Sequence, residues 1–136
     1  MTTMTTFEAG PGLRTALRVD GWSTGVFGTF LLATAPLLRE PLGLPTSWSV
    51  PFGVGMLGGA AALLLMARHP RLPSRLAAVV VAVNALSAVL MVELAVIDLI
   101  PLTNWGRVFL FAGAAFVASF AALEFAGLRR RGPVAP

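Results

Sequence analysis

Residues 76–100 read LAAVVVAVNALSAVLMVELAVIDLI, and only Asn84, Ser87, Glu93 and Asp98 in this run are polar. A bilayer core of ~30 Å needs about 20 residues of apolar helix, so the run is long enough to cross a membrane. It is rich in alanine and does not alternate between apolar and polar residues, which favours a helix over a strand. A helix also satisfies its own backbone in lipid. The stretch therefore predicts a transmembrane helix.

Three further segments, 22–38, 49–67 and 106–128, meet the same criterion. Pro36 bends or ends the first, Pro51 lies in the first turn of the second, where its missing N–H costs nothing, and Pro101 stops the helix over 76–100. The composition is 57% hydrophobic and 12% charged, whereas soluble domains are about 25% charged. We predict an all-α bundle of four transmembrane helices, with the membrane domain at 22–128.

The arginines predict the orientation of this bundle. All basic residues are Arg, which together with the many Ala, Gly and Pro residues indicates a high-GC bacterial genome. Only Arg39 and Arg107 fall on one side of the predicted membrane domain. Because Arg near span ends favours the cytoplasm, we predict two helical hairpins in the bacterial inner membrane with both termini cytoplasmic. The cytoplasmic set is Arg14, Arg18, Arg68, Arg71, Arg75, Arg129, Arg130 and Arg131.

Residues 1–21 and 129–136 are predicted to be cytoplasmic tails. The first twelve residues, MTTMTTFEAGPG, are polar and broken by Gly and Pro, and we expect them to be flexible. The next segment, LRTALRVD (13–20), is either a short amphipathic segment on the membrane surface or the start of the first helix. A cleaved signal peptide is the alternative for the first span, but the proline after ATA (33–35) disfavours cleavage.

Small residues spaced four apart predict where the helices meet, because lipid provides no hydrophobic drive for helix association. We expect such contacts on each of three helices. The second helix, with GVGMLGGAAA at 53–62, is expected to pack centrally. The predicted contact residues are Gly21 and Gly25 on the first helix, Gly55 and Gly59 on the second, and Ala114, Ala118 and Ala122 on the fourth.

Glu93 is the main candidate for a functional residue. It lies seven residues before Ile100, about 10 Å below the predicted outer end of its helix at about 1.5 Å per residue. A charge near the centre of a span costs about 2.5–3.5 kcal/mol on insertion scales. We therefore expect Glu93 to be protonated, paired, or facing a wet cavity.

Two other acids are secondary catalytic candidates. Asp98 lies at the outer end of the third helix and is expected to pair with Arg107 or Arg39. Glu124 lies five residues before Arg129, about 7 Å from the inner end, and is expected to reach the inner surface or pair with an Arg there.

The candidate ligand-binding residues are Asn84, Ser87, Trp105 and Phe116. At about 100° per residue, Asn84 shares a helix face with Ser87 and points nearly opposite Glu93. Asn84 is expected either to bond neighbouring helices or to contact a ligand. Trp105 begins the fourth helix and Phe116 lies within it, and lipid contact is the competing interpretation for both aromatic residues.

Cofactor and metal sites are not expected. The chain has no Cys and one His, and it lacks P-loop and zinc-protease motifs. The net charge of +4 does not indicate nucleic acid, because the arginines separate apolar runs and form no stripe on a polar surface. The expected partners are membrane lipid, a lipophilic small molecule, and a second copy or another membrane protein.

Five short features resemble a group of uncharacterised small four-helix membrane proteins common in high-GC bacteria. They are L-R-V-D (17–20), L-G-L-P (42–45), Asn84, L-T-N-W-G (102–106) and G-L-R-R-R (127–131). The resemblance covers nearly the whole chain. It implies the four-span topology and no particular activity.

Four functional hypotheses follow. The leading hypothesis is a membrane protein that binds an apolar small molecule or lipid among its helices, with Glu93 as the polar or proton-active group. The second is a membrane-embedded cyclase or isomerase, in which Glu93 protonates a terpenoid-like or polyketide-like substrate and Asp98 or Glu124 acts as base. The third is a proton-coupled exporter of small molecules, and the fourth is a structural accessory subunit.

Overall fold

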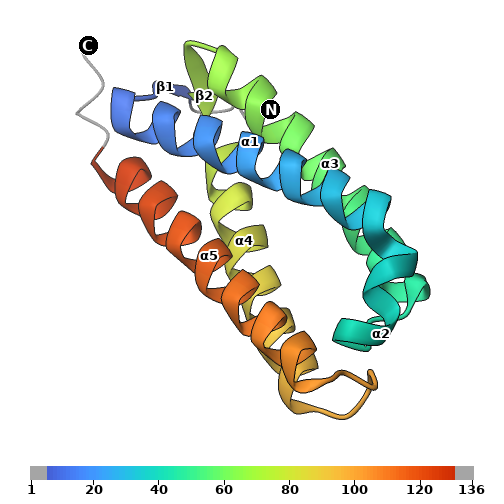
Figure 1. Ribbon diagram of the computed structural model, residues 1–136. Coiled ribbons are helices and arrows are strands. Elements are labelled where there is room, and N and C mark those ends of the chain that lie inside the picture. Colours follow the sequence, from blue (N-terminus) through green and yellow to red (C-terminus); the bar gives the residue numbers. More distant parts are fainter. Residues whose placement is uncertain (1–5, 131–136) are drawn as a thin grey trace, which may run out of the picture.

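The computed structural model describes residues 6–130, and helices dominate this part of the chain (Figure 1). Four helices are long: α1 (Pro11–Thr34), α3 (Thr46–Arg68), α4 (Ser74–Val96) and α5 (Asn104–Arg129). The short elements are β1 (Thr6–Glu8), the 3-10 helix η1 (Ala35–Leu38), α2 (Arg39–Leu42) and β2 (Arg71–Pro73). The four long helices are long and apolar enough to cross a membrane, which confirms the prediction of an all-helical, multi-span chain.

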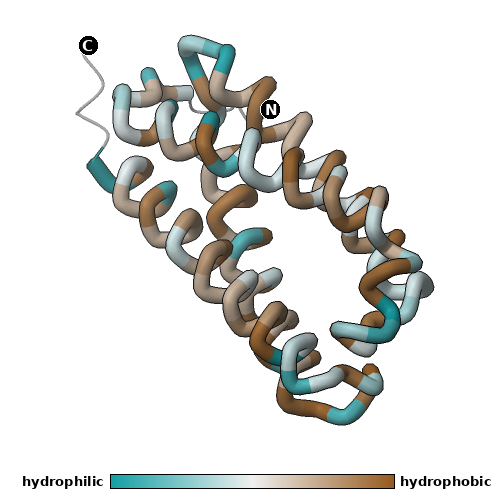
Figure 2. Tube along the Cα trace, viewed as in Figure 1, coloured by the Kyte–Doolittle hydropathy of each residue, from teal (hydrophilic) through white to brown (hydrophobic). Residues whose placement is uncertain are grey.

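The outer surface of these helices is apolar. Between 17% and 28% of the residues in each apolar window are buried inside the protein, and large side chains such as Val26, Leu86 and Val108 are exposed. Exposed apolar surface of this extent costs free energy in water but not in lipid. Figure 2 shows hydrophilic residues gathered mainly at the helix ends and connections. The surface is therefore suited to a lipid environment.

The long helices form two antiparallel hairpins. α1 packs along α3, and α4 packs along α5 (Figure 1). Contacts between the two hairpins are concentrated between α1 and α5, with a second set between α2 and α5. Each hairpin is thus packed within itself and shares a smaller interface with the other.

Glycines on α1 allow the close approach of α1 and α3. A Cβ added at Gly28 would lie 3.0 Å from the Cβ of Met56, and one at Gly21 would lie 2.9 Å from the side chain of Leu64. A Cβ at Gly25 would lie 3.3 Å from that of Ala60. The predicted close contact through Gly21 and Gly25 is therefore confirmed.

The predicted contact through Gly55 and Gly59 is wrong. A Cβ at either position would have no neighbour within 4 Å, and both residues are exposed. On α5, Ala114 is buried but Ala118 and Ala122 are exposed. Small residues occur on both faces of these helices, so their spacing does not show which face contacts a neighbouring helix. The prediction that the second long helix packs centrally is also wrong, because α3 packs mainly on α1.

The N-terminal segment is more ordered than predicted. Helix α1 begins at Pro11, so the segment 13–20 is the start of the first helix; proline suits this first turn because its φ is already helical. Strand β1 pairs antiparallel with β2, and Phe7 lies opposite Leu72. Both side chains are buried, which explains why this part of the expected flexible tail is fixed. Residues 1–5 of that tail lie outside the described residues.

Helix α4 ends at Val96, four residues before the predicted end. The Ile97 N–H still donates to the Glu93 carbonyl at 2.9 Å, but the Ile97 backbone is extended. Two causes are visible: Pro101 disfavours helix at the preceding residue, and Ile100 turns inward and is buried. The segment 97–103 therefore forms a connection beyond the helix.

Two apolar clusters close the two ends of the bundle. One lies near the arginine-rich ends of the helices and is called the basic-end cluster: Phe7, Leu13, Leu17, Leu63, Met66, Ala67, Leu72 and Ala77. The other is called the opposite-end cluster: Leu31, Leu44, Leu94, Ala95, Ile100 and Leu110.

A backbone joint connects the hairpins beside the opposite-end cluster. The Thr103 N–H donates to the Leu42 carbonyl at 3.0 Å, and the Thr103 hydroxyl donates to the Pro41 carbonyl at 2.7 Å. Gly43 has a φ of 66°, and any side chain there would collide with the Pro101 carbonyl. The motifs L-G-L-P and L-T-N-W-G, which are far apart in the sequence, meet at this joint.

Candidate functional site

Helices α1, α4 and α5 each contribute one polar side chain to a buried cluster, which we call the acid–amide cluster: Asp20, Asn84 and Glu124. Asp20 is 4% exposed and Glu124 is 1% exposed. The Asn84 Nδ2 donates to Asp20 Oδ2 at 3.1 Å and to Glu124 Oε1 at 2.6 Å. Because an amide nitrogen carries two hydrogens, one Asn84 side chain joins both acids and all three helices.

The two acids differ in how fully their oxygens are bonded. Thr24, one turn after Asp20, donates its hydroxyl to Asp20 Oδ1 at 3.0 Å. Asp20 therefore accepts hydrogen bonds at both oxygens. The Oε2 atom of Glu124 is buried and has no hydrogen-bond partner. The cluster thus contains one unpaired buried oxygen.

Helical spacing places these acids on buried faces. Leu13 and Leu17 lie seven and three residues before Asp20, and both are buried on the same side of α1. On α5, Phe120 and Ala121 lie four and three residues before Glu124 and are also buried. The acids therefore belong to stripes of side chains that are otherwise apolar.

The cluster lies within three of the helices that are long and apolar enough to cross a membrane. Asp20 is about 14 Å from the start of α1, Asn84 about 15 Å from the start of α4, and Glu124 about 7.5 Å from the end of α5, at about 1.5 Å per residue. Residues of the basic-end cluster separate it from the arginine-rich ends, and the opposite-end cluster lies on its other side. The cluster is enclosed between two apolar layers.

No arginine neutralises the acid–amide cluster in the described part of the chain, where the one ion pair joins Asp98 and Arg107. The guanidinium of Arg129, the nearest arginine along α5, lies over the ring of Phe125, 5.7 Å from its centroid. Two adjacent carboxylates with only neutral donors repel each other strongly in apolar surroundings. The arrangement is therefore chemically suited to hold a proton or to bind a cation.

Glu93 lies elsewhere, on the exposed side of α4. Because α4 ends at Val96, Glu93 is about 4.5 Å from the helix end at about 1.5 Å per residue, less than half the predicted depth. It borders a shallow, open apolar groove of about 460 Å³ between α4 and α5, together with Ala88 and Ala114. The structure places Glu93 outside the interior of the bundle.

The other two predicted acids have different outcomes. The Arg107 guanidinium donates to Asp98 Oδ1 at 3.1 Å, which confirms that predicted ion pair, and both side chains are solvent-facing. The expectation that Glu124 reaches the inner surface or pairs with an Arg is wrong. Glu124 lies on the helix face directed at α1 and α4, where Asn84 is its partner.

Among the predicted ligand-binding residues, Asn84 lies at the centre of the acid–amide cluster and Ser87 is half-buried one turn further along α4. Trp105 is 72% exposed. Phe116 is also exposed, with its ring in an edge contact to Phe120 at 5.0 Å between centroids. These two aromatic residues face the outside, where lipid contact is the available role.

The sequence interpretation misses Asp20, because it places residues 1–21 in a cytoplasmic tail, and it gives no role to Thr24 in the first predicted span. The available signal was the face shared by Leu13, Leu17 and Asp20, which continues into the first span once the helix begins at Pro11. The four-residue spacing of Asp20 and Thr24 is a second signal for a local hydrogen bond.

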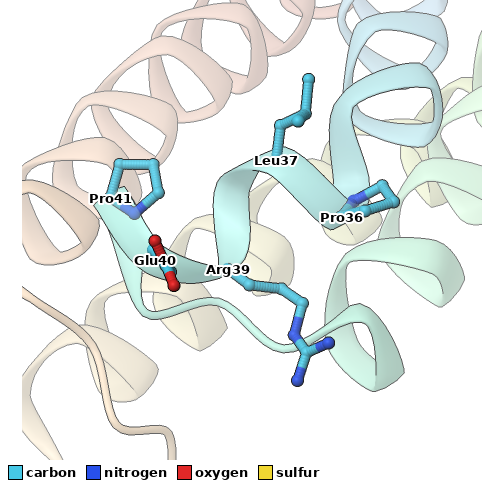
Figure 3. A pocket seen from close by; sticks show the side chains of 5 residues that line it. All are labelled: Pro36, Leu37, Arg39, Glu40 and Pro41. Carbon is cyan, nitrogen blue, oxygen red and sulfur yellow. The ribbon is translucent and has the colours of Figure 1, made fainter.

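A second hollow, open to the surroundings and about 530 Å³ in volume, lies beside η1 and α2. It is lined by Pro36, Leu37, Arg39, Glu40 and Pro41. Figure 3 shows that Leu37 and Arg39 extend in opposite directions from the ribbon, so these side chains do not converge on one point. This hollow lacks the geometry of a binding site.

The fold and the site together define a class, a protein of four long helices, each apolar enough to cross a membrane, with a buried acid–amide cluster between two hairpins. A scan against protein-family models found no matching family, and searches of curated proteins and solved structures found no significant match. Within residues 6–130, no group of three or more His, Cys, Asp or Glu side chains is arranged to hold a metal ion.

Proposed function

We propose that this protein binds a lipophilic small molecule between its two helical hairpins and that the acid–amide cluster makes the polar contact. The observation that carries the proposal is the buried and unpaired Oε2 of Glu124. A buried acceptor without a partner costs about 1–3 kcal/mol, and a donor supplied by a ligand or a bound proton removes that cost. This assigns to Glu124 the role first given to Glu93.

The interface between the hairpins supports the proposal. Each hairpin is packed within itself, so a separation of α1 from α5 opens the cluster without unfolding either hairpin. Along the same interface the rings of Phe27 and Phe109 lie 5.6 Å apart. Aromatic surface beside a few polar groups is the usual composition of a small-molecule site.

The experiment is a binding measurement on purified protein in detergent or nanodiscs. The probes are tetraphenylphosphonium and the neutral triphenylphosphine oxide, which have similar size and aromatic surface. We expect Glu124→Gln to weaken binding of at least one probe about tenfold, which corresponds to about 1.4 kcal/mol. The matched control is Glu93→Gln, which changes an exposed acid in the same way and should leave binding unchanged.

Two results contradict this proposal. If neither probe binds the wild-type protein, the accessory-subunit hypothesis is favoured. If Glu93→Gln weakens binding and Glu124→Gln does not, the site lies in the groove between α4 and α5.

A membrane-embedded cyclase or isomerase is the second candidate function, and the buried, unpaired Oε2 atom of Glu124 favours it as well. A protonated carboxyl group that is shielded from water is suited to protonate an alkene or epoxide. The discriminating measurement is turnover of a terpenoid-like or polyketide-like substrate by purified protein. Turnover that is lost in Glu124→Gln and retained in Glu93→Gln would establish the enzyme.

We also propose that the protein lies in the bacterial inner membrane with both termini in the cytoplasm. The arginines at the start of α1, the end of α3, the start of α4 and the end of α5 support this orientation, because these four helix ends lie on one side. Arg131, also assigned to this side, lies outside the described residues. The chain has no Cys, so a cysteine introduced by substitution is the only thiol that a maleimide can label. An impermeant maleimide should label Asn104→Cys in intact cells and Arg130→Cys only after permeabilisation. The reverse pattern would invert the proposed orientation.

A further inference from the structure

We infer that the acid–amide cluster is a proton-exchange site for lipophilic cations, in which the ligand's positive charge replaces one proton held by the two acids. The inference rests on the proposed function, because it names the ligand class of the same site. The geometry of Asp20, Asn84, Thr24 and Glu124 carries it.

The hydrogen bonds of the cluster leave room for a single proton. Asp20 accepts from Thr24 at one oxygen and from Asn84 at the other, and Glu124 accepts from Asn84 at Oε1. These donors are neutral, so they do not compensate two negative charges in apolar surroundings. The oxygen left open is Glu124 Oε2, which can carry the proton.

The charged side chains on the four long helices do not neutralise the two acids of the acid–amide cluster. The Arg14 guanidinium on α1 donates to the His69 carbonyl at 3.4 Å. The other arginines at this end have exposed side chains; they are Arg18 on α1, two residues before Asp20, Arg68 on α3, Arg75 on α4, and Arg129 and Arg130 on α5. At the opposite end, Arg107 on α5 pairs with Asp98, and Glu93 on α4 is exposed.

The exchange conserves charge at the site. In the empty state one proton and two carboxyl groups carry a net charge of −1. When a monovalent cation binds, the Glu124 O–H bond breaks, the proton passes to water, and two carboxylates with one cation again carry −1. The apolar layers around the cluster therefore penalise both states similarly, which favours one-for-one exchange. A neutral ligand leaves the proton in place.

The test uses full-length protein in detergent and weak buffer with a pH indicator. Tetraphenylphosphonium should bind with release of about one proton per bound cation, and its affinity should rise about tenfold per pH unit while the site is protonated. Triphenylphosphine oxide should release no proton. Glu124→Gln should lose proton release, whereas the control variants Glu93→Gln and Glu40→Gln should keep it. Size-exclusion chromatography and circular dichroism check that each variant is folded.

The outcomes separate the inference from the proposed function. If tetraphenylphosphonium binds the wild-type protein without proton release, the exchange is refuted and the proposed function stands. If the neutral analogue alone binds, the cation class is refuted. If neither probe binds, the proposed function fails. Each of these outcomes is decided by the wild-type protein alone, so the inference can be refuted even if a variant fails to fold.

Discussion

Replacing Asn84 with leucine tests the acid–amide cluster most directly, because it removes the bridging donor and keeps a side chain of similar size. The variant loses the hydrogen bonds of 3.1 Å to Asp20 and 2.6 Å to Glu124. Interhelical hydrogen bonds in membrane proteins contribute about 0.6 kcal/mol on average and up to about 1.7, so the two bonds account for about 1–3 kcal/mol. A buried carboxyl oxygen left without a donor adds about 1–3 kcal/mol. We expect the free energy of unfolding to fall by about 2–6 kcal/mol.

The assay is reversible unfolding in mixed detergent–SDS micelles, followed by circular dichroism. Ala85→Leu is the matched control, because it places leucine at the next position of α4, on an exposed face. It should change the free energy of unfolding by less than about 0.5 kcal/mol. A double-mutant cycle of Asn84→Leu with Glu124→Gln should give a coupling energy of about 0.5–3 kcal/mol, because the two residues are in contact.

If Asn84→Leu lowered the free energy of unfolding by no more than Ala85→Leu does, the acid–amide cluster would not contribute to the stability of the fold. Additivity of the two changes within about 0.3–0.5 kcal/mol would likewise show that Asn84 and Glu124 do not interact.

Three further predictions concern the surroundings of the site. Gly106→Ala should lower the free energy of unfolding by about 1–3 kcal/mol in the same assay, because its Cβ would overlap the Leu42 carbonyl. The control Gly58→Ala should be neutral or stabilising, because a Cβ there has no neighbour within 4 Å. Equal effects of the two substitutions would contradict the contact between α2 and α5. Asp98→Asn should cost less than about 1 kcal/mol, because its ion pair is exposed, and a larger loss would show that the pair is shielded. Phe7→Ala should cost about 3 kcal/mol and speed amide exchange in β1 and β2; unchanged exchange would mean that the strand pair does not depend on this ring.

The number and type of the main elements could be predicted from the sequence, because a long apolar run allows few structures in lipid. Two helix ends could not be predicted in the same way. The charged residues of segment 13–20 suggest a surface position, yet its apolar face packs in the basic-end cluster. Ile100 extends the apolar run but turns inward, so the run is longer than helix α4.

The candidate site was only partly predictable, because depth along one helix says nothing about the neighbouring helix. Glu93 was favoured from its distance to an assumed helix end, and the earlier end of α4 removes that argument. Asn84 was identified correctly as a residue that bonds helices, but its partners come from segments 64 and 40 residues away. The spacing of the segments 42–45 and 102–106 in the sequence likewise does not indicate that they form one joint.

The order in which the cluster's residues leave the ribosome has a consequence for biogenesis. Asp20 is synthesised first, Asn84 follows 64 residues later and Glu124 another 40 residues later. At about 5–20 residues per second, these intervals are several seconds each. During the first interval Asp20 has Thr24 as its only partner of the cluster. The cluster therefore becomes complete only when α5 has been synthesised, so the polar groups on α1 and α4 lack Glu124 until the last helix is present.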